Sequence, residues 1–87
     1  MGRSATSGVV RVRLFARYAE LVGGEETTVS LSLPASVGDV VARVRALPGG
    51  SEIPEHPLVA VNLRQARLDA LVGAGDEVAL LPPVSGG

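Results

Sequence analysis

Apolar and polar residues alternate along two segments in the first half of the chain, residues 9–15 and 27–33. A period of two places every second side chain on one face, which is typical of a strand with one buried side. We therefore predict a strand over each segment. Between them, the apolar spacing of residues 16–22 predicts a short helix that ends at a pair of glycines. Pro34 is expected to stop the second strand, because proline cannot donate a hydrogen bond to a neighbouring strand.

A helical pattern begins at Ser36. Ser36 and Asp39 have the spacing of a capping box, in which each side chain accepts a hydrogen bond from the backbone of the other residue. Apolar residues then recur at intervals of three and four, at Val37, Val40, Val41, Val44 and Leu47. This pattern predicts one long helix, ended by Pro48 and the two glycines after it. Residues 48–57 are rich in proline and glycine and predict a surface loop.

The second half of the chain contains shorter apolar segments. Residues 58–61 are continuously apolar and predict a strand, and residues 65–68 predict a brief partner for it after a turn. Residues 69–75 are predicted to be a connector, with Leu71 and Val72 directed toward the interior.

Residues 77–81 predict the last strand, and their apolar run favours a central position in the sheet. One long helix can cover only one face of a sheet, so the chain predicts an α+β domain. We expect a mixed sheet of four to five strands with the helix packed across one face. The predicted boundaries are a flexible extension over residues 1–8, the domain over 9–81 and a flexible tail over 82–87.

A chain of 87 residues with a net charge of −1 predicts one small domain. Its core leaves little room for an enclosed substrate pocket, which weighs against a self-contained enzyme. The charge gives no electrostatic case for nucleic acid, and one Phe and one Tyr offer little surface for base stacking. No apolar run reaches the length of a membrane span, and the polar start lacks a signal-peptide core. We therefore expect a cytoplasmic protein.

The chain contains neither cysteine nor lysine, and its eight cationic side chains are all arginines. Thiol nucleophiles and thiolate metal ligands are therefore excluded, and no side-chain amine of this chain can attack an activated carboxyl. No lysine follows the glycines as in a phosphate-binding loop, so we expect no bound ATP, other cofactor or metal. His56 and the glutamates are expected to be exposed polar residues rather than catalytic acids and bases.

The chain ends on Pro82-Pro83-Val84-Ser85-Gly86-Gly87. The prolines lack N–H donors, so the strand cannot continue and the tail is expected to leave the sheet. Glycine has no Cβ, so the last two residues suit a narrow channel in another protein. The candidate reactive group is the terminal carboxyl of Gly87. A frayed end without function is the ordinary alternative.

Five segments in this order resemble a known family, the small sulfur-carrier subunit of molybdopterin synthase, which belongs to the ubiquitin-related β-grasp group. The resemblance spans nearly the whole chain after residue 8, and the ending is its most specific part. The segments are Leu14-Phe15-Ala16 with Glu20-Leu21-Val22-Gly23, Ser36-Val37-Gly38-Asp39-Val40-Val41, Val59-Ala60-Val61-Asn62, Gly75-Asp76-Glu77-Val78-Ala79, and Leu81 to Gly87.

The resemblance implies a protein cosubstrate rather than an enzyme. An E1-like adenylyltransferase would consume ATP to adenylate Gly87, and the adenylate would be converted to a thiocarboxylate. The large catalytic subunit of the synthase would then receive the tail and pass the sulfur to a pterin precursor of the molybdenum cofactor. The tail residues Pro83, Val84, Ser85 and Gly86 would thread the channel. The apolar residues Phe15, Leu80 and Leu81 are candidates for docking the partner.

Adenylation makes chemical sense because a carboxylate is a poor electrophile and AMP is a good leaving group. A thiocarboxylate in turn concentrates charge on a polarizable sulfur. Three alternatives remain open from the sequence. A related carrier would supply sulfur for thiamine or cysteine biosynthesis, a ubiquitin-like modifier would join its terminus to lysines of other proteins, and a plain interaction domain would not use its tail.

Overall fold

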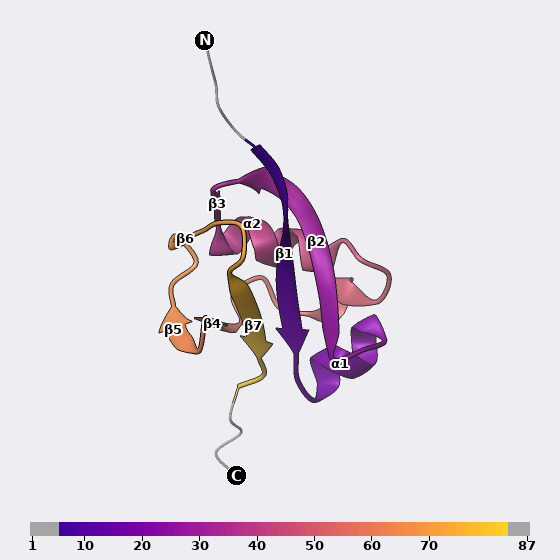
Figure 1. The fold of residues 1–87 in the computed structure, drawn as a ribbon. Coiled ribbons are helices and arrows are strands. Elements are labelled where there is room, and N and C mark those ends of the chain that lie inside the picture. The colour runs from indigo at the N-terminus through magenta and orange to yellow at the C-terminus, as the bar shows by residue number, and fades with distance from the viewer. Residues whose placement is uncertain (1–5, 84–87) are drawn as a thin grey trace.

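The computed structural model describes residues 6–83 of the chain. A five-stranded mixed sheet has the strand order β2-β1-β7-β4-β5 (Figure 1). Strands β1 and β7 are parallel, and the other neighbouring strands are antiparallel. The strands are β1 (Thr6–Leu14), β2 (Glu26–Leu33), β4 (Leu58–Val61), β5 (Arg64–Ala66) and β7 (Glu77–Leu81).

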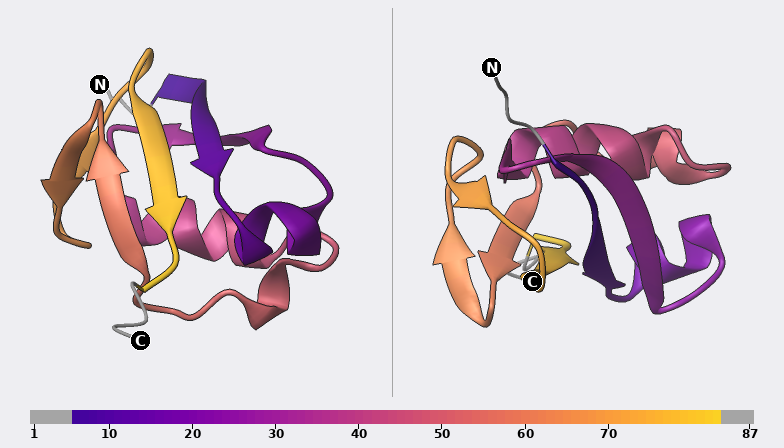
Figure 2. Two further views of the ribbon diagram at one scale, coloured as in Figure 1. Left: turned by 90° about the horizontal axis from the view of Figure 1, so that it is seen from below. Right: turned by 45° about the horizontal axis from the view of Figure 1, so that its top comes forward.

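Helix α2 (Val37–Arg45) crosses one face of this sheet and leaves the other face open (Figure 2). Its four buried valines are those that the sequence pattern predicted for its apolar face. The strands contribute every second side chain to the same core, so the period of two is confirmed. The buried strand residues are Val10, Val12, Leu14, Val29, Leu31, Leu33, Val59, Val78 and Leu80.

The predicted capping box at the start of α2 is confirmed. Ser36 Oγ accepts a hydrogen bond from Asp39 N at 3.0 Å, and Asp39 Oδ2 accepts one from Ser36 N at 3.2 Å. Both bonds satisfy N–H groups that have no partner within the first turn of a helix. The capping box therefore fixes the start of α2 at Ser36.

Two shorter helices and a small second sheet complete the fold. Helix α1 (Arg17–Val22) ends at Gly23, and η1 (Gly50–Glu52) is a single 3-10 turn. The strands β3 (Ala35–Ser36) and β6 (Leu71–Val72) pair antiparallel outside the main sheet. No helix within residues 6–83 is long and apolar enough to cross a membrane.

The first strand starts earlier than predicted. It begins at Thr6 rather than at residue 9, and Gly8 lies opposite Leu31 in the ladder with β2. Residues 6–8 therefore belong to the sheet and not to the extension that was predicted over 1–8. Residues 6–8 are polar or glycine, so they show no alternation of apolar and polar residues that would predict a strand. They form one because they pair with the long strand β2. Strand β5 is also shifted, to Arg64–Ala66 from the predicted 65–68.

The segment 48–57 is not the simple surface loop that its composition predicted. Ile53 is fully buried with 0% of its surface exposed. Arg45, at the end of α2, fixes this segment by donating from Nε to Ile53 O at 2.6 Å and from Nη2 to Ser51 O at 3.3 Å. The glycines of the segment allow close packing: a Cβ at Gly49 would collide with the carbonyl of Leu21.

Leu71 was predicted to point inward together with Val72, and for Leu71 this was wrong. Leu71 is 69% exposed, whereas Val72 is 1% exposed. The two residues form strand β6, in which successive side chains point to opposite sides. A strand of two residues has too short a pattern for sequence analysis to detect.

We predict that Ile53→Ala lowers the free energy of unfolding by about 2–5 kcal/mol, because it leaves a cavity among fully buried residues. Chemical denaturation followed by circular dichroism measures the change. The matched control is Leu71→Ala, which removes a similar side chain from an exposed position and should stay within about 0.5 kcal/mol of the parent. Equal losses in the two variants would contradict the placement of Ile53 in the core.

Candidate functional site

The strand that leads to the C-terminal tail lies in the middle of the sheet. β7 pairs with β1 on one side and with β4 on the other, as its apolar sequence predicted. Val78 and Leu80 are fully buried. Pro82 and Pro83 follow directly and are not part of any strand. The chain thus leaves the sheet from a strand that is held on both sides.

The predicted reactive residue Gly87 and the predicted threading residues Val84, Ser85 and Gly86 lie outside the described residues. Pro83, the first residue of the predicted threading segment, is exposed. The roles of these five residues therefore remain predictions that rest on the sequence.

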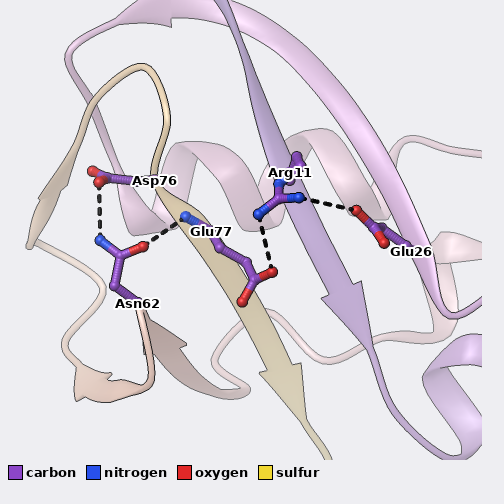
Figure 3. Close-up of polar contacts among 5 residues, drawn as sticks. All are labelled: Arg11, Glu26, Asn62, Asp76 and Glu77. Atoms are coloured by element: carbon purple, nitrogen blue, oxygen red, sulfur yellow. Dashed lines mark hydrogen bonds and ion pairs between the residues drawn. The ribbon is translucent and has the colours of Figure 1, made fainter.

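A network of polar contacts fixes the beginning of β7 (Figure 3). The backbone N–H of Asn62 donates to Glu77 O at 2.9 Å, and the side-chain Oδ1 of Asn62 accepts from Glu77 N at 3.0 Å. Asn62 Nδ2 donates to Asp76 Oδ1 at 2.9 Å, while Asp76 Oδ2 accepts from Gly73 N at 2.8 Å. Asn62 has a positive φ of 51°, a conformation that Asn tolerates better than most residues. One side chain thus joins the turn after β4 to the start of β7.

These hydrogen bonds also stabilise the charged form of Asp76. The backbone N–H of Gly73, followed by the side-chain amide of Asn62, lowers the pKa of the Asp76 carboxyl below its ordinary value. The turn before β7 is therefore best held when Asp76 is ionised.

The open face of the sheet is charged near the start of β7. Arg11 Nη2 lies 3.4 Å from Glu77 Oε2, and Arg11 Nη1 lies 3.8 Å from Glu26 Oε2, which joins β1 to both of its neighbours (Figure 3). Exposed ion pairs of this kind contribute little to stability. Their main consequence is that this half of the open face is polar.

The opposite half of the open face, where β7 ends, carries exposed apolar side chains. Leu81 lies opposite Leu58 in the β4–β7 ladder, and Phe15 follows Leu14, which lies beside Leu80 in the β1–β7 ladder. Phe15 is 37% exposed and Leu58 is 44% exposed. Leu63 is 87% exposed and follows Asn62 in the turn near the start of β7, and it extends this apolar surface along β4. We call Phe15, Leu58, Leu63 and Leu81 the exit patch, because most of it lies where the chain leaves the sheet.

The exit patch is hollowed on the side of β4. Leu58, Leu63 and Leu81 line a depression of about 290 Å³ together with Val59, Ala60 and Gln65. At its other end, the guanidinium of Arg13 lies 5.4 Å from the centre of the Phe15 ring, which places Phe15 on the open face with Arg13. The patch therefore offers an apolar surface with a cation at one border.

The structure corrects one predicted docking residue. Leu80 is fully buried in the core and cannot contact a partner, whereas its neighbour Leu81 lies on the open face. Leu58 and Leu63 were missed by the sequence analysis. Their exposure follows from the pairing of β4 with β7 and from the turn at 62–63, which no local pattern reveals.

Within residues 6–83 no group of three or more His, Asp or Glu side chains is placed to hold a metal ion. His56 is exposed. The described residues thus provide a strand end that is paired on both sides and lies beside an apolar surface.

The sequence matches the model of the ThiS family over residues 12–87. The chain belongs to the ThiS family. The family resemblance and the β-grasp fold that the sequence predicted are thereby confirmed, and the match extends through the tail.

Two curated relatives and one solved structure illustrate what this ThiS-family chain is similar to. Small archaeal modifier protein 1 from Haloferax volcanii is 39% identical over 84 residues, which cover 86% of this chain and 97% of the relative. The crystal structure of SAMP1 from Haloferax volcanii has a TM-score of 0.79 and 34% identity, covering 92% of this chain and 100% of that one. The molybdopterin synthase sulfur carrier subunit of Dictyostelium discoideum is 31% identical over 85 residues, covering 93% of this chain and 99% of the relative.

Another structural neighbour is seen in a complex. A chain in the protein–protein complex of subunits 1 and 2 of molybdopterin-converting factor from Helicobacter pylori has a TM-score of 0.64 and 25% identity. The match covers 91% of this ThiS-family chain and 99% of that chain. A protein of this fold thus assembles with a second subunit.

We predict that acid weakens the turn before β7 through Asp76. The folded pKa of Asp76 is lowered, so its contribution to stability is present above the unfolded pKa of about 3.9 and is lost as the pH falls through the folded pKa. Asp76→Asn removes this contribution and should melt at a lower temperature than the parent at pH 7. The gap should shrink below about pH 4, as thermal unfolding between pH 7 and pH 3 would show. A gap independent of pH would contradict the role of the ionised carboxylate.

Proposed function

We propose that this protein is a sulfur carrier, the small subunit of a molybdopterin synthase, and that the C-terminal carboxyl of Gly87 carries the sulfur. The observation that carries the proposal is the position of β7. This strand is held on both sides, and it ends in two prolines beside the exposed exit patch. The ThiS-family match through residue 87 and the names of the relatives support it.

The chemistry requires activation of the Gly87 carboxylate. In the proposed first step, the carboxylate oxygen attacks the α-phosphorus of ATP on an E1-like adenylyltransferase, and pyrophosphate leaves. A sulfide-equivalent nucleophile then displaces AMP from the acyl carbon, which gives the thiocarboxylate. The chain itself binds no cofactor in this scheme, and the activating partner consumes the ATP. The absence of cysteine agrees with a carrier whose reactive sulfur is placed on the chain end.

The exit patch is the proposed docking surface for the large catalytic subunit. An exposed group of Phe and Leu side chains on a small domain suits burial in a partner, and aromatic and aliphatic anchors often dominate such interfaces. The patch adjoins Pro82 and Pro83, so docking there would direct the tail into the same partner. The Helicobacter pylori complex of subunits 1 and 2 supports a partner of this kind.

In this account the protein is a cosubstrate, and the catalytic groups belong to the large subunit. A related carrier for thiamine or cysteine biosynthesis would share the fold and the Gly-Gly end. The run Pro82-Pro83-Val84 favours the pterin pathway, because it resembles the proline-rich ending expected of molybdopterin synthase small subunits. Co-purification with a large synthase subunit distinguishes these pathways.

A second candidate function is protein modification. The 39% identity to Small archaeal modifier protein 1 favours it, and the same activated carboxyl would then acylate a lysine amine of another protein. The chain has no lysine, so it offers no side-chain amine that could accept a second copy. Immunoblots for heavier covalent adducts in cells separate a modifier from a carrier that is used only as a thiocarboxylate.

We predict that deletion of Gly87, and separately Gly86→Trp, abolishes sulfur transfer while the domain stays folded. The deletion moves the reactive carbon back by one residue, and the indole would block a channel that admits only glycine. Conversion of the pterin precursor by the reconstituted synthase measures transfer, and circular dichroism checks the fold. Normal activity of Gly86→Trp would contradict the narrow-channel argument.

We predict that Leu58→Asp weakens binding to the large subunit at least about tenfold, equivalent to about 1.4 kcal/mol, by placing a charge in the exit patch. Calorimetric titration of the two subunits measures the loss. The matched control is Val9→Asp, which alters an apolar side chain with 52% exposure on the same face at the far end of β1. Equal effects of the two substitutions would contradict docking through the exit patch.

A further inference from the structure

The two edge strands of the sheet differ in how they are protected against further pairing. β5 is three residues long and carries Arg64. β2 is eight residues long, has no charged residue after Glu26, and pairs with β1 in an unbroken register without a bulge. Natural sheets blunt their edges with short strands, charges, prolines or bulges, because an open edge is a template for another strand. From Thr27 to Leu33, β2 has none of these.

The backbone of β2 has hydrogen-bonding groups directed away from the sheet. Leu14 N donates to Glu25 O at 2.9 Å, which marks a hydrogen-bonded pair in the antiparallel ladder. Such pairs alternate with pairs whose N–H and C=O groups point outward. The alternation directs the backbone groups of Thr28, Ser30 and Ser32 away from β1. Within residues 6–83 these groups form no backbone hydrogen bond to another segment.

A groove between β2 and α2 runs along this open edge. It consists of two adjoining hollows of about 330 Å³ and about 280 Å³. The helix side is lined by Ala42 and Ala46, whose small side chains leave the groove open. The first hollow is lined by Leu31, Ser32, Ala35, Asp39, Ala42 and Arg43. The second hollow is lined by Thr28, Val29, Ser30, Arg43, Ala46 and Leu47.

Arg43 supplies the charge of the groove. It lines both hollows, is exposed, and forms no ion pair with another residue in the described part of the chain. Asp39, at one end of the groove, is already bonded to the backbone of Ser36 in the capping box. The groove thus combines an open strand edge, space for side chains and one unpaired cation.

We propose that the β2 edge binds an extended segment of a partner protein as an additional strand, with aliphatic side chains in the groove and a carboxylate on Arg43. Main-chain hydrogen bonds to Thr28, Ser30 and Ser32 hold the segment, and alternate side chains enter the two hollows. The surface lies at the sheet edge opposite β5, away from the exit patch. A partner bound there leaves the tail free to enter a second protein.

The charge of the groove disfavours a second copy of this chain as the occupant. Arg43 and Ser30 line the same hollow. Two β2 strands paired symmetrically about Ser30 would bring the Arg43 side chains of both copies to one seam, where they repel each other. An acidic segment of another protein instead neutralises Arg43.

The test uses the capped peptide Ser-Val-Thr-Ile-Thr-Glu-Ser, in which the alternate residues Val, Ile and Glu face the groove. Titration into the isotope-labelled full chain should shift the amide resonances of Thr28, Ser30 and Ser32 and slow their hydrogen exchange, and leave Leu58 and Leu81 unchanged. The same peptide with Lys in place of Glu should bind about threefold more weakly, as expected for the loss of one exposed ion pair.

Two variants make the test specific. Arg43→Glu changes an exposed side chain, and the peptide with Lys should then bind more tightly than the peptide with Glu. Ser30→Pro removes one outward N–H and should abolish binding of both, with circular dichroism as the check on folding. The proposal would be overturned if the amide resonances at the β2 edge did not shift. It would also be overturned if the Glu peptide still bound more tightly than the Lys peptide to Arg43→Glu. Self-association through β2 without peptide would also overturn it, in favour of a second copy.

Discussion

The central position of β7 is the constraint on which the rest of the account depends. This strand is parallel to β1 and antiparallel to β4, so both sides of its backbone are paired. Val78 and Leu80 are fully buried, and burial of such a side chain contributes about 1.5–3 kcal/mol. A chain end that follows such a strand can be pulled into a partner without loosening the domain. The folded domain and the chain end that we propose to be reactive are therefore mechanically separate.

The two faces of the sheet and its β2 edge differ in what they can contact. One face of the sheet is covered by α2 and forms the core (Figure 2). The open face is polar around Arg11 and Glu77 and apolar around the exit patch. A partner with an apolar binding surface is therefore expected to bind at the exit patch, near the end of β7. The β2 edge provides a third surface on the far side of the sheet. A small carrier can in this way meet several proteins without a catalytic pocket of its own.

Much of the fold could be predicted because local patterns and tertiary burial agree. The period of two in β1 and β2, the valine spacing of α2 and its capping box each reflect a contact that forms in the structure. The burial of Ile53 could not be predicted, because it depends on Arg45 and on the close approach of two glycines to other segments. Likewise, the apolar run of β7 has no alternation. It predicted a central strand but not that Leu80 faces the core while Leu81 faces outward.

The candidate site also has one part that the sequence predicts and one part that only the fold reveals. The sequence alone indicates Gly87 and the prolines before it, since the signal lies in consecutive residues. The exit patch requires the cross-strand pairing of Leu58 with Leu81 and the turn that exposes Leu63, so only the fold reveals it. The Asn62–Asp76 contacts also join residues that are distant in the sequence and become visible only in three dimensions.

The most direct test of the account is fragmentation mass spectrometry of the intact chain after incubation with an activating enzyme of the E1-like class, ATP and a sulfide donor. We expect a mass increase equal to the exchange of one oxygen for one sulfur, confined to the fragment that ends in Gly87. A chain whose mass stays unchanged, or whose added sulfur lies elsewhere, would contradict it.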